Sequence, residues 1–147
     1  MSVMNGMNIS SSGMSAQRLR MDIISQNIAN VNTTRDENGD SYKRQMVVFA
    51  EKNVHTFDNV LKTAQGGTTV SNGVKVTQII ADDKTPMKMV YDPSHPDADD
   101  EGYVAYPNVN TVTEMTDLID ASRSFEANVT AFNATKNMAL KSLELGK

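Results

Sequence analysis

Both ends of this chain repeat their apolar residues at the alternating three- and four-residue spacing of a coiled-coil helix. In residues 111–145 this spacing is followed by Met115, Leu118, Ser122, Phe125, Val129, Phe132, Lys136, Ala139 and Leu143. A helix over this segment would be roughly 50 Å long at about 1.5 Å per residue. Such a helix needs a partner along much of its length, and this requirement restricts the fold more than any other feature.

The N-terminal segment, residues 9–31, carries two such rows. The first row consists of Met14, Gln17, Met21, Ile24, Ile28 and Val31. The second consists of Ile9, Ser12, Ala16, Leu19, Ile23, Gln26 and Asn30. Two rows on one helix predict more than one neighbour, although rows of this kind also occur on helices that face an ordinary core. Within the chain only this segment can cover the C-terminal helix, so an antiparallel pair is predicted.

The predicted pair is short of apolar surface for its length. Ordering the backbone of each residue costs about 1–2 kcal/mol of conformational free energy. The pair has few apolar side chains whose burial could offset this cost. We therefore expect the two ends to order fully only when they pack against other subunits. One row of the first helix would face the second helix, and the row that begins at Ile9 would face neighbours. The candidate seam and interface residues are Ile9, Met14, Leu19, Met21, Ile23, Ile24, Ile28, Met115, Leu118, Phe125, Val129, Phe132 and Leu143.

The middle of the chain favours strands and loops. Strands are predicted over 42–51, 74–80 and 87–91, with residues 82–86 as the turn between the last two. Residues 52–73 contain two Gly-rich turn signals and little periodicity, which indicates a flexible loop. The predicted fold is α+β, with residues 1–34 and 108–147 as the two helices of a coiled-coil domain. Residues 35–107 would form a small β-rich central domain.

Local signals place the ends of these elements. The first helix is predicted to begin after Asn8 or within Ser10–Ser12, whose hydroxyl groups can cap a first turn. Thr111 and Glu114 have the spacing of a capping box at the start of the second helix, and Gly146 would mark its end. Gly39, in a charged turn, is expected to adopt a positive φ.

Composition excludes several classes of function. The chain has 147 residues, 39% of them hydrophobic, a net charge of −4 and no cysteine. An acidic chain without a basic run argues against nucleic acid as a partner. The lack of cysteine excludes disulfides and thiolate metal sites. No apolar run is long enough to span a bilayer, and the first residues do not have the pattern of a cleaved secretory signal.

Few residues suggest chemistry. The two histidines, His55 and His95, lie far apart in sequence, without a third ligand at a recognisable spacing. The acidic residues between Asp92 and Glu101 do not follow the calcium-loop pattern, so a solvated loop is the favoured interpretation. No nucleophile motif or phosphate-binding loop is present. We therefore expect no enzyme activity, metal, cofactor or small-molecule substrate.

Two groups of segments resemble the axial proteins of the bacterial flagellum. Residues 12–17 (SGMSAQ) and 22–33 (DIISQNIANVNT) are similar to the N-terminal motif shared by rod and hook proteins. Residues 86–96 (PMKMVYDPSHP), 102–104, 107–110 and 121–128 (ASRSFEAN) resemble the proximal-rod branch of that family. The chain departs from many relatives in the acidic loop that separates Thr33 from Tyr42.

The resemblance implies a structural subunit of the proximal rod, assembled into a helical tube that transmits torque around an export channel. It implies other rod subunits, basal-body components and the flagellar type III export apparatus as partners, with peptidoglycan nearby. The implied location is the basal body, outside the inner membrane, which is the periplasm in a diderm. Export would occur without signal cleavage. The alternatives are another axial subunit or a soluble helical module that binds one partner.

Overall fold

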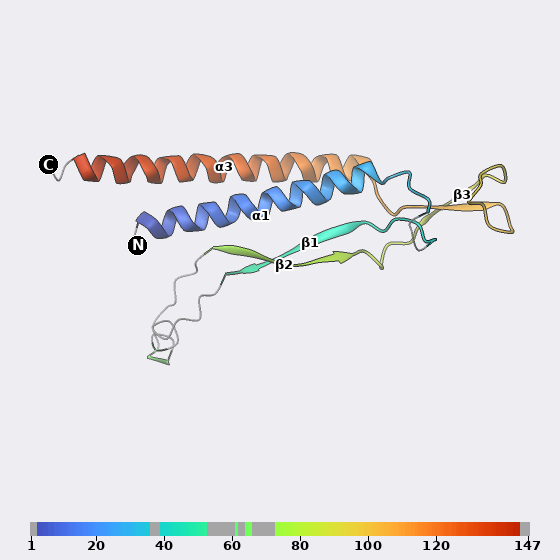
Figure 1. The fold of residues 1–147 in the computed structure, drawn as a ribbon, viewed down its shortest axis with the longest axis horizontal. Helices are drawn as coiled ribbons and strands as arrows, with labels where there is room; N and C mark the ends of the chain where they lie inside the picture. Colours follow the sequence, from blue (N-terminus) through green and yellow to red (C-terminus); the bar gives the residue numbers. More distant parts are fainter. Residues whose placement is uncertain (1–2, 36–38, 53–60, 62–63, 66–72, 145–147) are drawn as a thin grey trace. The chain divides into compact units, whose positions relative to one another are not determined.

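The described part of the chain has a long helix near each end of the sequence and four short strands between them (Figure 1). The computed structural model describes residues 3–35, 39–52, 61, 64–65 and 73–144. Within this part, the elements in order are α1 (Val3–Ala29), β1 (Gln45–Glu51), β2 (Val74–Ala81), β3 (Lys88–Tyr91), β4 (Tyr103–Tyr106) and α3 (Thr111–Glu144). This composition confirms the predicted α+β class.

Contacts divide the chain into two compact units. Unit 1 comprises Met1–Arg18, Phe49–Thr77 and Ser122–Lys147, and unit 2 comprises Leu19–Val48 and Gln78–Ala121. Each unit therefore contains part of both helices and part of the strand-bearing middle of the chain.

The four strands form two separate two-stranded sheets, β1 with β2 and β3 with β4. In unit 2 the carbonyl of Arg44 accepts the N–H of Asp82, and in unit 1 the N–H of Lys52 donates to the carbonyl of Gly73, each at 2.8 Å. These bonds fit an antiparallel β1–β2 pair. Residues 82–86 do connect β2 to β3, as predicted, but these two strands belong to different sheets.

The sequence prediction missed β4. It pairs antiparallel with β3 in a register that places Val90 opposite Val104 and Tyr91 opposite Tyr103. The strand has only four residues and lies between Gly102 and Pro107, so its alternation is too short to stand out from the irregular sequence around it. Its pairing partner was predicted correctly, with β3 observed at Lys88–Tyr91.

Helix α1 begins at Val3, several residues before the predicted start. The serines expected to cap it lie inside the helix instead. The hydroxyl of Ser12 donates to the carbonyl of Ile9 at 2.7 Å, a bond that allows a serine to remain in a helix interior. The prediction was wrong because short hydroxyl residues serve both as caps and as helix-interior donors.

Helix α3 begins where predicted, but a different residue caps it. The Asn110 side-chain oxygen accepts the N–H of Val112 at 3.0 Å. Glu114 is fully buried and bonds to other partners, so the predicted capping box is wrong. Gly39 has a φ of 90°, which confirms the predicted turn conformation. Gly146 and most of residues 52–73 lie outside the described residues.

Candidate functional site

In unit 1 two glycines of α1 lie against polar side chains of α3. A Cβ on Gly13 would lie 2.8 Å from the amide oxygen of Asn128, and one on Gly6 would lie 3.5 Å from the Thr135 methyl group. A step of seven residues along α1 thus corresponds to a step of seven in the opposite direction along α3. The helix segments are antiparallel in this unit, at heptad spacing. The absence of a side chain at Gly13 permits the close approach of Asn128.

In unit 2 the contact between α1 and α3 is a buried polar junction built around Asn27. The side chain of Asn27 is 1% exposed and uses all of its hydrogen-bonding capacity. Its Nδ2 donates to the Gln45 carbonyl and to Glu114 Oε2, each at 2.9 Å. Its Oδ1 accepts the Gln45 N–H at 2.9 Å and the Tyr42 hydroxyl at 2.8 Å. One amide therefore links α1, α3 and the start of β1.

The carboxylate of Glu114, which is also buried, is satisfied from two sides. Arg44 Nε donates to Glu114 Oε1 at 2.6 Å, while Asn27 occupies the other oxygen. Arg44 also reaches Asp117 Oδ2 at 3.4 Å, and Arg20 of α1 donates to Asp117 Oδ1 at 3.1 Å. A buried charge is stable only when it is paired and hydrogen-bonded, and this geometry provides both.

The junction perturbs the ionisation of Tyr42. Burial, and secondly the negative charge of Glu114, raise the pKa of the Tyr42 hydroxyl. The hydroxyl therefore stays protonated as a donor to Asn27 well into the alkaline range.

Asn108 joins the junction to the turn after β2. Its side-chain oxygen accepts the N–H of Arg44, and its Nδ2 donates to the carbonyls of Asp82 at 2.8 Å and Thr85 at 3.1 Å. The Thr85 hydroxyl and the N–H groups of Lys84 and Thr85 bond to the Asp82 carboxylate and lower its pKa. A polar network thus extends from the helices to the base of the β3–β4 pair.

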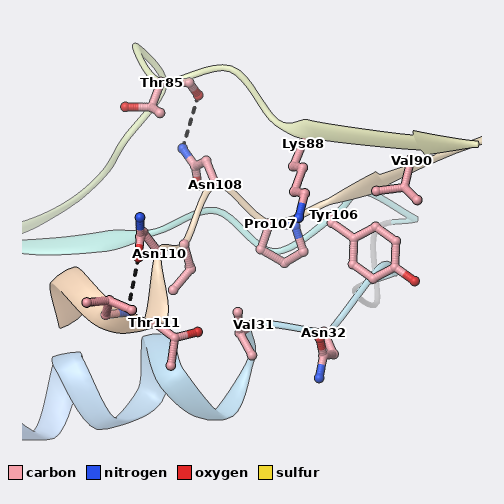
Figure 2. Close-up of a pocket in the computed structure, with 12 residues that line it drawn as sticks. Val31, Asn32, Thr85, Lys88, Val90, Tyr106, Pro107, Asn108, Asn110 and Thr111 are labelled. Carbon is pink, nitrogen blue, oxygen red and sulfur yellow. Dashed lines mark hydrogen bonds between the residues drawn. The ribbon is translucent and has the colours of Figure 1, made fainter. Parts of the chain in front are cut away.

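A groove of about 640 Å³ lies beside Asn108 in unit 2. Figure 2 shows residues around it from the segment just after α1, from β3 and β4, and from the start of α3. Its apolar lining includes Val31, Val90, Val109 and Val112. Among the residues that the structure describes, no group of three His, Asp or Glu side chains could hold a metal ion.

The predicted interface residues fall into three groups by exposure. Ile23 and Ile24 are buried, whereas Met115 is 54% and Leu143 71% exposed. The remaining predicted residues are partly buried: Ile9, Met14, Leu19, Met21, Ile28, Leu118, Phe125, Val129 and Phe132.

The row that begins at Ile9 is largely covered by its own chain. Ala16 and Ile23 are buried, and the Ser12 hydroxyl accepts the N–H of Val74 at 3.1 Å. The prediction that this row as a whole faces neighbouring subunits therefore does not hold for these three residues. The outward-facing positions of α1 are instead mostly polar, among them Ser11, Ser15, Arg18, Asp22 and Ser25.

The sequence prediction missed the polar junction because it located the contact between the two helices by apolar periodicity alone. The covered face of α3 passes through Glu114, Leu118, Ala121, Phe125, Asn128, Phe132, Thr135 and Ala139. This row has the predicted spacing and shares Leu118, Phe125, Phe132 and Ala139 with the predicted row. Its other four positions lie one residue earlier and include polar Glu114 and Asn128. A polar residue at a heptad position was the signal that could have found them.

Comparisons with known proteins agree with the motifs in the sequence. Residues 7–35 match the family described as "Flagella basal body rod protein", and residues 100–145 match "Flagellar basal body rod FlgEFG protein C-terminal". Over its whole length the chain is 47% identical to the flagellar basal-body rod protein FlgC of Bacillus subtilis (strain 168), which is also covered completely. The chain belongs to the FlgC family of flagellar basal-body rod proteins.

Other FlgC proteins are also similar over nearly their whole length. The protein from Borreliella burgdorferi is 43% identical, with 99% of this chain and 98% of the relative covered. The protein from Yersinia enterocolitica is 40% identical with both chains covered completely. The resemblance to rod proteins is therefore confirmed over the whole FlgC length, and the polar junction lies within it. No helix in the described part of the chain is long and apolar enough to cross a membrane.

Proposed function

We propose that this chain is a structural subunit of the proximal rod of the flagellar basal body and has no enzymatic role. The observation that carries the proposal is the full-length match to FlgC rod proteins. The subunits would assemble into a helical tube that transmits torque and surrounds the export channel. A contact between two different surfaces that does not close into a ring produces such an open helical assembly.

The exposed apolar side chains of α3 support this proposal. In unit 2, Val112, Met115 and Ile119 are exposed at a spacing of three and four residues, which places them on one helix face. In unit 1, Met138, Leu140 and Leu143 are also exposed. Large apolar side chains that are exposed in a single subunit in this way are typical of positions that another protein covers. We assign these positions to contacts with neighbouring rod subunits, together with the partly buried members of the predicted interface set.

In unit 1 the two helices extend to different lengths, as expected for a pair that becomes fully ordered only when a second subunit covers the longer helix. α1 begins three residues before Gly6, whereas α3 continues for nine residues beyond Thr135. Leu140 and Leu143 thus extend past the described part of α1. A second subunit that covers them would supply the apolar contacts that the pair lacks.

The wider partners and location follow from the same proposal. The partners are other rod subunits, basal-body components at the base of the rod and the type III export apparatus. The subunit would lie outside the inner membrane, in the periplasm of a diderm, after export without signal cleavage. A chain whose helices are completed only by neighbours could pass the export channel unfolded.

The test replaces the chromosomal gene with one that encodes the double variant Met115→Asp/Ile119→Asp. A gene that encodes Thr113→Asp provides the matched control. Thr113 is exposed on the same helix about 100° from Val112, and an acidic residue suits the first turn of a helix. We expect the double variant to be exported but absent from purified basal bodies, and the cells to be non-motile. Normal incorporation of the double variant would contradict the assigned interface. Absence of the wild-type chain from basal bodies would contradict the function itself.

A soluble helical binding module is the second candidate function, and circular dichroism of the purified chain distinguishes it. A binding module would be strongly helical in isolation. A rod subunit would gain much of its helix content only on assembly, since its exposed apolar positions have no partner in the single chain.

A further inference from the structure

The β3–β4 pair has two different faces. Antiparallel register places Val90 opposite Val104 on one face, and Val104 is 1% exposed. The other face consists of Met89, Tyr91, Tyr103 and Ala105, which we call the ribbon face. Met89 is 55%, Tyr91 63% and Tyr103 40% exposed. Three large side chains are thus held in solvent by a sheet that has only two strands.

The ribbon face is ordered before any partner arrives. The rings of Tyr91 and Tyr103 pack edge to face, with centroids 5.3 Å apart. Gly102, which has a φ of 82°, lies so close that a Cβ there would be 3.0 Å from the Tyr91 ring. Rigid aromatic side chains lose little entropy on binding, and tyrosine and methionine are enriched at protein interfaces.

The loop that joins the two strands places negative charge at one end of this face. Between Asp92 and Glu101 it carries five carboxylates and no lysine or arginine: Asp92, Asp97, Asp99, Asp100 and Glu101. Asp97 anchors the loop, since its carboxylate accepts the Thr34 hydroxyl at 2.8 Å and lies 3.6 Å from the Arg35 guanidinium. Asp99 accepts the N–H groups of Glu101 and Tyr103, which fixes the loop beside the ribbon face. Asp100 and Glu101 remain exposed.

We propose that the ribbon face is a docking surface for a different protein, one that presents an apolar centre flanked by lysine or arginine. The apolar centre would cover Met89 and the two tyrosines, and the basic groups would pair with Asp100 and Glu101 or lie over the tyrosine rings. A second copy of this chain fits this chemistry less well, because the chain has a net charge of −4 and a contact between two ribbon faces would bring two acidic loops together. The inference rests on the proposed rod function in one respect: the partner is sought among basal-body proteins.

The test places the photo-crosslinking residue p-benzoylphenylalanine at position 91 of the full chain, in cells that assemble basal bodies. This substitution keeps an aromatic ring on the ribbon face. After irradiation, basal bodies are purified and the crosslinked peptides are identified by mass spectrometry. We expect a peptide from another basal-body protein that carries lysine or arginine close to the crosslinked residue. Adding Asp100→Lys/Glu101→Lys should lower the crosslink yield about tenfold, since like charges would then oppose each other.

Asp40→Lys provides the matched control, because it reverses an exposed carboxylate in another loop of unit 2 and should leave the yield unchanged. A crosslink to a second copy of this chain would overturn the inference, as would a yield that the Asp100 and Glu101 reversals do not lower. Basal bodies that contain the chain but give no crosslink would also overturn it, and would leave the proposed rod function intact. Basal bodies that lack the wild-type chain would overturn both.

Discussion

Asn27 Nδ2 donates to Glu114 Oε2 at 2.9 Å, and the two residues, 87 positions apart in sequence, are almost completely removed from solvent. They belong to α1 and α3. A buried amide at a heptad position is known to fix the register of a coiled coil, because every other register would leave it without partners. The four satisfied hydrogen bonds of Asn27 give α1 and α3 such a device in unit 2. Apolar contacts alone would tolerate a shift of one helix along the other.

Asn27→Asp should destabilise the junction strongly. The change replaces the Nδ2 donor by an oxygen that would face the Glu114 carboxylate and the Gln45 carbonyl. Two lost bonds and an uncompensated buried charge predict a loss of about 3–5 kcal/mol. The measurement is urea unfolding of the purified chain by far-ultraviolet circular dichroism, at an osmolyte concentration that orders the helices of the unassembled chain in every variant.

Asn30→Asp is the matched control for this change. Asn30 lies in the same sequence motif, but its amide donates to the Gln26 carbonyl at the protein surface. We expect an effect within about 0.5 kcal/mol there. Combining Asn27→Asp with Glu114→Gln should recover part of the loss, since an amide would again donate to an oxygen across the helices. Equal effects of Asn27→Asp and Asn30→Asp would show that the junction does not control stability.

Gly13→Ala and Gly6→Ala should change stability in opposite directions. A Cβ at Gly6 meets the Thr135 methyl group at ordinary van der Waals distance, so alanine should add about 0.5–1 kcal/mol through its helix propensity. At Gly13 the Cβ would approach Asn128 Oδ1 to 2.8 Å. The Asn128 amide would have to leave the Ser124 carbonyl that it now contacts at 2.8 Å, which should cost about 1–3 kcal/mol.

Gly13→Ala/Asn128→Ala tests the cause of that loss. Removing the amide should make room for the new methyl group, so the double variant should be more stable than the sum of the single changes predicts. Additive effects in urea unfolding would mean that Gly13 is required for another reason than its contact with Asn128.

The helix pair and three of the four described strands could be predicted from the sequence because each depends on local periodicity. Leu118, Phe125 and Phe132 follow the heptad spacing, and Met87, Met89 and Tyr91 alternate as a strand requires. The pairing of β2 with β1 could not be predicted in this way, since a turn-like segment such as 82–86 does not specify whether the strands it joins hydrogen-bond to each other. β4 was missed for a different reason, since a strand of four residues is too short for its alternation to stand out.

The polar junction could not be predicted because its members are distant in sequence and individually ordinary. Glu114 has the position and spacing of a capping residue, and only the approach of Arg44 and Asn27 explains its burial. Arg44 is charged, and a charged side chain is ordinarily expected at the protein surface. Long-range burial of a charge depends on the whole fold, whereas capping patterns depend on four neighbouring residues.

Tyr42 should make the junction sensitive to alkaline pH. Because burial and Glu114 raise the Tyr42 pKa above 10.0, the folded state holds this proton more tightly than the unfolded state. The associated stability is complete below the unfolded pKa and is lost as pH rises through the folded pKa. Tyr42→Phe should therefore be less stable than wild type near neutral pH, by about 1 kcal/mol for one hydrogen bond, yet lose less stability at high pH.

The measurement for Tyr42 is urea unfolding of both proteins from neutral pH to beyond pH 10. Lys43 also has a raised pKa, owing to its hydrogen bond and charge interaction with Asp83, and its stabilisation is likewise lost at high pH. The difference between wild type and Tyr42→Phe isolates the tyrosine, since Lys43 is present in both. Parallel pH profiles would contradict the coupling between Tyr42 and the junction.

Gly73→Ala should be among the most destabilising substitutions in unit 1, for two separable reasons. Gly73 has a φ of 107°, which side-chain-bearing residues rarely adopt, and its Cβ would overlap the Ser12 hydroxyl. Ser12→Ala removes the overlapping hydroxyl but also the acceptor for the Val74 N–H. Gly73→Ala/Ser12→Ala should therefore recover the steric part of the loss and retain the backbone strain, about 1 kcal/mol or more.

Urea unfolding of the two single variants and the double variant separates these contributions. Complete recovery in the double variant would show that the backbone at Gly73 can relax, and no recovery would show that the Ser12 contact is unimportant.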